Sequence, residues 1–195
     1  MHLPAVRKSE HRNAMLMFNS LVRTRQMANE AWSGIDVQLK RRSELVPNLV
    51  ESVKGYATHE RSVLEEVTRL RNAAREVPAD DVAGRAQAER ALTTAIGKLV
   101  ALAENYPALK ASANFLELQQ ELSNLEEELQ MARRYYNGTV RNQNVLVQSF
   151  PGNLVAGAFG FGPRDYFELS DAAERHGQAS PTRRCLLRQG DGQRR

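Results

Sequence analysis

Residues 113–140 read ANFLELQQELSNLEEELQMARRYYNGTV, and this stretch decides the fold. Residues three and four apart lie on the same side of an α-helix, so steps of three and four mark an apolar stripe. Such steps alternate without a miss along this stretch, through Phe115, Leu118, Leu122, Leu125, Leu129, Ala132 and Tyr136. The pattern predicts one long helix, from about Ser112 to Ser149, that packs its apolar stripe against partner helices.

Three further helices are expected upstream, over about 14–42, 43–76 and 82–106, because each carries a similar stripe. Pro78 and the two aspartates that follow it separate the second from the third, with Asp80 or Asp81 as the N-cap. Pro47 favours a boundary near Ser43, because proline cannot donate to the helix ladder. A single kinked helix is the alternative, since the stripe continues in phase through Val46, Leu49, Val53 and Tyr56.

These segments predict an all-α fold, an antiparallel up-and-down four-helix bundle with long helices over residues 14–150. The composition agrees, because the chain of 195 residues is 42% hydrophobic and no stretch alternates with a strand period. In such a bundle the first helix begins where the fourth one ends. The apolar runs MLMFNSLV (15–22) and NLVAGAFGFG (153–162) are therefore expected to lie close together.

The remaining segments differ in character from the bundle. Residues 1–13 form a basic N-terminal segment, residues 151–170 an apolar loop rich in glycine and aromatic residues, and residues 171–195 a basic tail expected to be disordered. The net charge of +4 belongs to the two ends, because residues 13–170 carry a net charge of −1. A nucleic-acid partner is not expected, since such a partner needs basic residues clustered on a folded face.

The sequence shows no pattern typical of catalysis, so no catalytic residue, cofactor or metal site is expected. None of the four histidines has the Glu-x-x-His spacing of a di-iron bundle, and neither a G-x-S-x-G motif nor a P-loop is present. GAFGFG follows a helix rather than a strand, which disfavours a dinucleotide site. The single cysteine, Cys185, excludes an intramolecular disulfide. We therefore expect a protein that is not an enzyme.

Two polar clusters are candidate contacts for a partner or ligand. Arg41, Arg42 and Asn48 lie at the expected junction of the first two helices, and Arg133 and Arg134 lie within the last one. An arginine can bind an anion or a partner carboxylate through two parallel hydrogen bonds. The alternative is that both clusters form salt bridges and helix caps within the bundle.

Four segments together resemble the LemA family. They are AWSGIDVQLKRRSELVPNLVESVKGYATHE (31–60), VALAENYPALKASANFLELQQEL (100–122), ARRYYNGTVRNQN (132–144) and FPGNLVAGAFGFGPRDYFE (150–168). The resemblance runs from about Phe18 to Arg175. It implies a bacterial four-helix bundle held at the cell membrane by one N-terminal transmembrane helix, with no established catalytic residues.

In this sequence MHLPAVRKSEHRNAMLM stands where the resemblance implies an anchor, and it is too charged and too short to span a bilayer. The chain as written is therefore expected to be soluble, and either cytoplasmic or peripherally associated with the membrane. The charge-free run from Asn142 to Pro163 offers a surface contact. Its candidate membrane-contact residues are Leu154, Val155, Phe159 and Phe161. The alternative is a loop that packs its phenylalanines onto the bundle.

The function expected from these observations is a non-enzymatic, membrane-associated scaffold or protein-interaction bundle with an unidentified protein partner. The alternative is a ligand-sensing bundle that binds an anion or a peptide near Arg41, Arg42 and Asn48. The oligomeric state is left open by the sequence.

Overall fold

The computed structural model describes residues 4–57 and 60–168, with the backbone alone for residues 4–11. The prediction of an all-α fold is confirmed over these residues, which contain helices and no strand. The helices are α1 (Pro4–Lys54), α2 (Arg61–Glu76), α3 (Val82–Ala103), the single turn α4 (Pro107–Lys110), α5 (Ala113–Gln148) and α6 (Gly152–Phe159). The predicted disordered tail, residues 171–195, lies outside the described residues.

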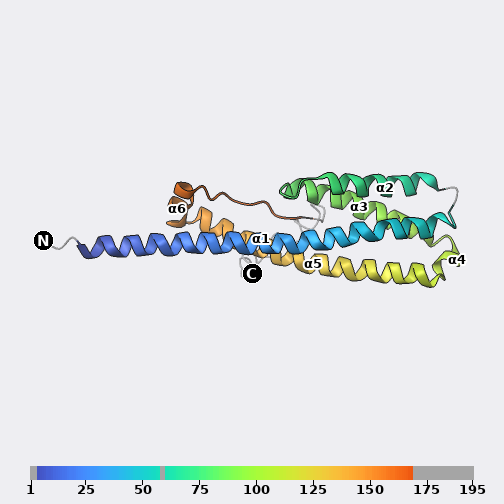
Figure 1. Ribbon diagram of the computed structural model, residues 1–195, viewed down its shortest axis with the longest axis horizontal. Coiled ribbons are helices and arrows are strands. Elements are labelled where there is room, and N and C mark those ends of the chain that lie inside the picture. The colour runs from blue at the N-terminus through green and yellow to red at the C-terminus, as the bar shows by residue number, and fades with distance from the viewer. Residues whose placement is uncertain (1–3, 58–59, 169–195) are drawn as a thin grey trace, which may run out of the picture.

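The long helices α1 and α5 lie side by side over most of the molecule (Figure 1). They run in opposite directions, because Trp32 contacts Tyr136 while Arg41, further along α1, contacts Glu128, earlier on α5. The hairpin of α2 and α3 packs beside them at one end, called here the four-helix half. At the other end, called the tip half, α6 and the segment after it take the place of that hairpin (Figure 1).

The predicted boundary at Ser43 is wrong, and the alternative of one helix through Pro47 is correct. Proline at position 47 cannot donate to the carbonyl oxygen of Ser43, four residues earlier, which is left without its helical partner. Arg71 of α2 supplies the missing donor, since its Nε lies 2.7 Å from that oxygen. A long-range hydrogen bond thus replaces the one that proline removes.

The ends of the helices confirm some boundaries and correct others. Asp81 is the N-cap of α3, as expected, because its carboxylate accepts a hydrogen bond from the amide of Gly84 at 2.8 Å. The real break between α1 and α2 lies at residues 55–60, where Gly55 begins a turn. Helix α1 also begins earlier than expected, at Pro4, so much of the predicted N-terminal segment is part of it.

The expected loop over residues 151–170 contains the helix α6. Gly152 allows this helix to turn back tightly against α5, because a Cβ at this position would collide with the carbonyl oxygen of Leu146. Gly160 ends α6 in the left-handed conformation, with φ of 69°, which glycine adopts without steric cost. The helix therefore has a glycine at each end for a different steric reason.

Residues 161–168, called here the strap, return from α6 toward the middle of the molecule (Figure 1). Asn144 of α5 accepts a hydrogen bond from the amide of Arg164 at 2.8 Å and donates one to its carbonyl oxygen at 2.9 Å. Asn137 makes the same pair of bonds to Phe167, at 2.9 and 3.1 Å. Each asparagine side chain thus pairs with the strap as a neighbouring β-strand would.

The spacing of these contacts follows from backbone geometry. Seven residues of helix advance about 10.5 Å, and three residues of extended chain advance about 10 Å. Asn137 and Asn144 are seven residues apart, and their partners Phe167 and Arg164 are three apart. Helix and strap therefore stay in register over both contacts.

Candidate functional site

Arg42 lies in the interior of the four-helix half, with only 3% of its surface exposed. Its Nη2 donates to the hydroxyl of Thr93 at 2.7 Å, and its Nη1 lies 3.6 Å from Glu89 and 3.7 Å from Glu126. The guanidinium thus joins α1 to both α3 and α5. In the folded chain this burial leaves almost no surface of Arg42 for a partner or ligand.

Glu89, the main carboxylate beside Arg42, is buried as well, with 3% of its surface exposed. Burial raises the pKa of its carboxyl above the ordinary value of 4.5, because desolvation penalises the charged form. Arg42 and Arg85 act in the opposite direction, while Glu126 adds to the increase. This pair is a buried ionic contact between helices, which corresponds to the salt-bridge alternative stated for the arginine cluster.

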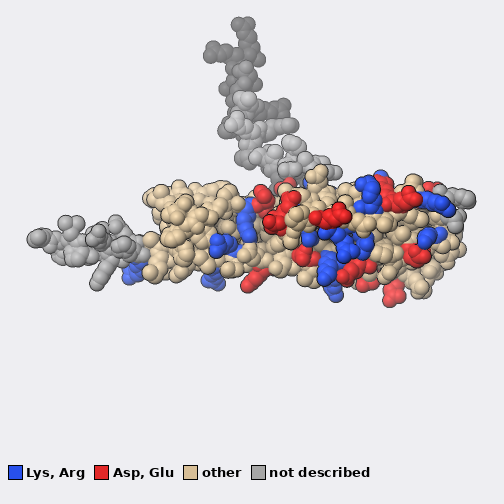
Figure 2. All heavy atoms as spheres, turned by 45° about the horizontal axis from the view of Figure 1, so that its top comes forward, with Lys and Arg blue, Asp and Glu red and all other residues tan. Residues whose placement is uncertain are grey.

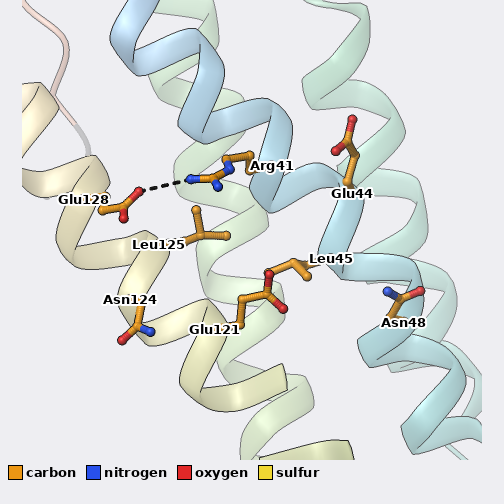
Figure 3. Close-up of a pocket in the computed structure, with 8 residues that line it drawn as sticks. All are labelled: Arg41, Glu44, Leu45, Asn48, Glu121, Asn124, Leu125 and Glu128. Atoms are coloured by element: carbon orange, nitrogen blue, oxygen red, sulfur yellow. Dashed lines mark hydrogen bonds and ion pairs between the residues drawn. The ribbon is translucent and has the colours of Figure 1, made fainter. Parts of the chain in front are cut away.

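Arg41 and Asn48, unlike Arg42, are exposed, and both line a groove of about 410 Å³ between α1 and α5 (Figure 3). Leu45 and Leu125 also line it, and Glu128 approaches Arg41 to 3.4 Å. The acidic side chains of the groove outnumber its single arginine, and they are Glu44, Glu121 and Glu128. An anion would meet net negative charge here, so the groove disfavours the anion-binding version of the ligand-sensing alternative.

Arg133 and Arg134 are not among the residues of this groove. They follow it along α5 toward the tip half, where Arg133 is half-buried and Arg134 is exposed. The structure therefore brings together Arg41 and Asn48 but not the two predicted arginine clusters. The groove also contains acidic residues that were not predicted as contacts: Glu121 and Glu128 lie seven residues apart on one face of α5, and Glu44 lies on α1.

The tip half ends in an apolar surface around α6. Leu154 and Phe159 are 64% and 62% exposed, and Phe150, just before this helix, is 79% exposed. Met15 and Leu16 of α1 are exposed as well, and Phe18 joins the two helices through its contact with Phe159, with ring centroids 4.8 Å apart. We call the exposed members of this group the apolar tip: Met15, Leu16, Phe150, Leu154 and Phe159.

The predicted membrane-contact residues therefore divide. Leu154 and Phe159 belong to the apolar tip, and Val155 is half-buried. Phe161 is only 7% exposed, because it packs against Phe18 and under the guanidinium of Arg25, which corresponds to the stated alternative of a phenylalanine packed onto the bundle. Figure 2 shows uncharged surface at this end of the visible face, whereas charged side chains gather over the rest of it.

The sequence analysis missed the residues that hold the strap. Tyr136, which belongs to the predicted apolar stripe, donates from its hydroxyl to the carbonyl oxygen of Asp165 at 3.1 Å and contacts Trp32. Phe167 packs against the same indole, and Trp32 itself donates to the carbonyl oxygen of Ala79 between α2 and α3. One cluster therefore joins the four-helix half to the strap. The only signal in the sequence was asparagine on an otherwise regular helix.

The described residues contain neither a metal-binding cluster nor a membrane-spanning helix. In this part of the chain, no group of three or more His, Cys, Asp or Glu side chains is arranged to hold a metal ion. Among the helices described, none combines the length and the apolar character needed to cross a membrane.

Comparison with known proteins gives consistent results. The family model described as LemA family matches residues 31–180, about three quarters of the chain. Protein LemA of Metamycoplasma hominis is 28% identical over 138 residues, which cover 71% of this chain and 63% of that protein. Magnetosome protein MamQ of Magnetospirillum gryphiswaldense is 22% identical over 184 residues, which cover 82% of this chain and 68% of that protein. With its family model matched over so much of the sequence, the chain belongs to the LemA family.

Proposed function

We propose that the protein is a non-enzymatic scaffold or interaction bundle that touches a bacterial membrane surface through its apolar tip and presents the four-helix half to a protein partner. The observation that carries the proposal is the exposure of large apolar side chains around α6, without a charged residue between Asn142 and Pro163. Membership of the LemA family supports the membrane location, given the anchored architecture that the resemblance implies.

Removing the apolar tip from water is energetically favourable. Fully burying one large apolar side chain contributes about 1.5–3 kcal/mol. Phe150, Leu154 and Phe159 each expose more than half of their surface, and none is flanked by a charge on α6. An aromatic and aliphatic surface of this kind suits the boundary between head groups and acyl chains.

The test is flotation of the full chain with liposomes of zwitterionic and of anionic lipid. Wild type is expected to float with both, and Phe150→Asp with Leu154→Asp to remain at the bottom of the gradient. These two side chains are exposed, so the variant is expected to keep the wild-type melting temperature. The control is Leu116→Asp, which removes an equally apolar side chain, 50% exposed, at the other end of α5. This variant is expected to float like wild type.

Two results would contradict the proposal. One is a wild-type chain that fails to float with either lipid mixture. The other is a tip variant that floats as well as the Leu116→Asp control does. Flotation with anionic lipid alone, lost when salt is raised, would instead assign binding to basic residues and would also reject the apolar tip as the contact.

A further inference from the structure

Helices α1 and α5 have a second surface, on the side away from the α2–α3 hairpin. The groove described above opens on this side, and Figure 3 shows it with α3 lying behind the two helices. Steps of three and four extend the same face toward the tip half. We call it the open face, and its central residues are Gly34, Val37 and Arg41 of α1 with Glu128, Met131, Tyr135 and Gly138 of α5.

The centre of the open face is apolar, and two glycines make a shallow depression in it. Val37, Met131 and Tyr135 are each more than half exposed. Apart from the backbone of their own helix, no atom lies within 4 Å of the place where a Cβ would stand on Gly34 or Gly138. Another helix can therefore approach the two backbones closely at this point, with apolar side chains on either side to cover.

Charge divides the open face and its rim into two halves around this centre. The half toward the α4 end holds Glu44, Glu121, Glu127 and Glu128 against Arg41 and Lys40. In the half toward the tip, two exposed arginines, Arg23 and Arg141, stand against Glu30, and Arg134 lies at the boundary between the halves. A face with acid at one end, base at the other and apolar residues between is complementary to its own copy turned end to end.

We infer that a second copy of the chain docks on the open face, antiparallel, about a two-fold axis near Gly34 and Arg134. The contacts between α1 and α5 place these two positions at about the same height along the molecule. Glu127 and Arg141 each lie seven residues from Arg134, on opposite sides, so the axis sets Glu127 against Arg141 of the partner subunit. It likewise brings Glu44 to the height of Arg23 of the partner subunit.

The open face is large enough for a stable dimer. From Leu16 to Asn48 it is roughly 48 Å long at ~1.5 Å per residue, and two helices are about 20 Å wide, which gives roughly 900 Å² per copy against about 800 Å² in a typical interface. A parallel dimer would use the same area but would set acid against acid. The charge division therefore selects the antiparallel arrangement.

The test is sedimentation equilibrium of the full chain at 1–100 µM, in low salt. Wild type is expected at twice the chain mass of 21.9 kDa. Glu127→Arg or Arg141→Glu alone sets like charges together at both ends of the axis and is expected to raise the dissociation constant at least tenfold. The double variant restores both pairs with their signs exchanged and is expected to recover the wild-type constant. Glu65→Arg, an exposed reversal on α2, is the control and is expected to have no effect.

Gly34→Trp provides a second test, because a bulky side chain at the axis keeps the two backbones apart and is expected to give a monomer, while the open space at this position leaves the fold of the single chain intact. Circular dichroism is used to establish that each variant keeps its helical content. A wild type that stays monomeric to 100 µM overturns the inference. A double variant as weak as either single one overturns the antiparallel pairing, and so does a dimer that survives Gly34→Trp.

Discussion

At the scale of single residues, neighbouring arginines in one helical turn have opposite roles. Arg42 is buried between three helices, whereas the side chain of Arg41 is 60% exposed in its ion pair with Glu128. Consecutive residues of a helix point in directions about 100° apart, so two adjacent arginines can face the core and the solvent. Residue type alone does not reveal which arginine is buried. The stripe did hold the information, since Arg42 falls three residues after Leu39 and four before Val46.

Replacing these arginines is expected to separate the two roles. Arg42→Ala leaves Glu89 charged and without its main partner in the core, which costs about 3–5 kcal/mol of the free energy of unfolding. Arg41→Ala removes an exposed pair and costs roughly 0.5 kcal/mol or less. Urea unfolding followed by circular dichroism measures both values. Equal losses in the two variants would show that Arg42 is not held as described.

Glu89 gives a prediction for pH. Burial raises the pKa of Glu89 in the folded chain, so between pH 4.5 and that raised value the folded state binds more protons than the unfolded state. The free energy of unfolding therefore falls as pH increases through this interval. The Glu89→Gln variant lacks this titration, so its stability relative to wild type is expected to increase as pH rises from about 4.5.

The measurement is urea unfolding of both proteins at several values between pH 4 and 7. Glu44→Gln, which changes an exposed carboxylate, is expected to follow wild type. If the free energy of unfolding of Glu89→Gln minus that of wild type stays constant with pH, or falls as pH rises, the assignment is contradicted.

At the scale of helices, the sequence predicted α5 and the beginning of α3 well, because a long unbroken stripe and an aspartate cap are local signals. For α1 the sequence left two alternatives, a boundary near Ser43 and one helix through Pro47, and the favoured boundary was wrong. The helix continues through Pro47 with a hydrogen bond from the Arg71 side chain to the Ser43 carbonyl oxygen, and these two residues are 28 positions apart. The sequence analysis had no means of pairing these residues. It also missed α6, since eight residues rich in glycine do not show a helical stripe.

The bond from Arg71 can be tested with a double-mutant cycle. Arg71→Met keeps much of the side chain's packing but leaves the buried Ser43 carbonyl without a donor, which is expected to cost about 1–3 kcal/mol. In a Pro47→Ala background the amide at position 47 supplies the donor, so the same change is expected to cost less than about 1 kcal/mol. Urea unfolding of the four proteins gives the coupling energy. A coupling energy near zero would show that Arg71 does not compensate for Pro47.

At the scale of the whole molecule, two halves of different construction share α1 and α5. The four-helix half has a broad apolar core, whereas the core of the tip half is small and is covered by α6 and the strap. The general class of this arrangement was predictable from periodicity, and so was the proximity of residues 15–22 and 153–162. The strap was not predictable, because its bonds come from side-chain amides that local patterns do not distinguish from surface asparagines.

The strap is expected to detach without unfolding the rest of the chain. Asn137→Asp with Asn144→Asp removes the two asparagine donors to the strap and sets carboxylates beside the carbonyl oxygens that accepted from them. Amide exchange at Arg164 and Phe167 is expected to accelerate about 10–100-fold, for ~1.4–2.8 kcal/mol of lost hydrogen bonding. The control is Asn142→Asp, an exposed asparagine on the same helix, which should leave both amides protected. Equal acceleration throughout α2 and α3 would mean that the whole fold depends on the strap.

The return of the strap also fixes where its last residues lie. Seven steps of extended backbone from Phe161 to Glu168 cover roughly 23 Å at ~3.3 Å each, directed from the tip toward the middle of the molecule. The end of the strap therefore lies at the middle of the molecule, called here the waist, level with Trp32 and the α2–α3 turn. It does not lie at the end that carries α6. A fluorophore at position 168 and a second one at position 154 are expected to report one fixed distance, because the strap holds position 168 at the waist while α6 carries position 154 at the tip. The strap therefore sets how far the waist stands from any surface that the tip touches.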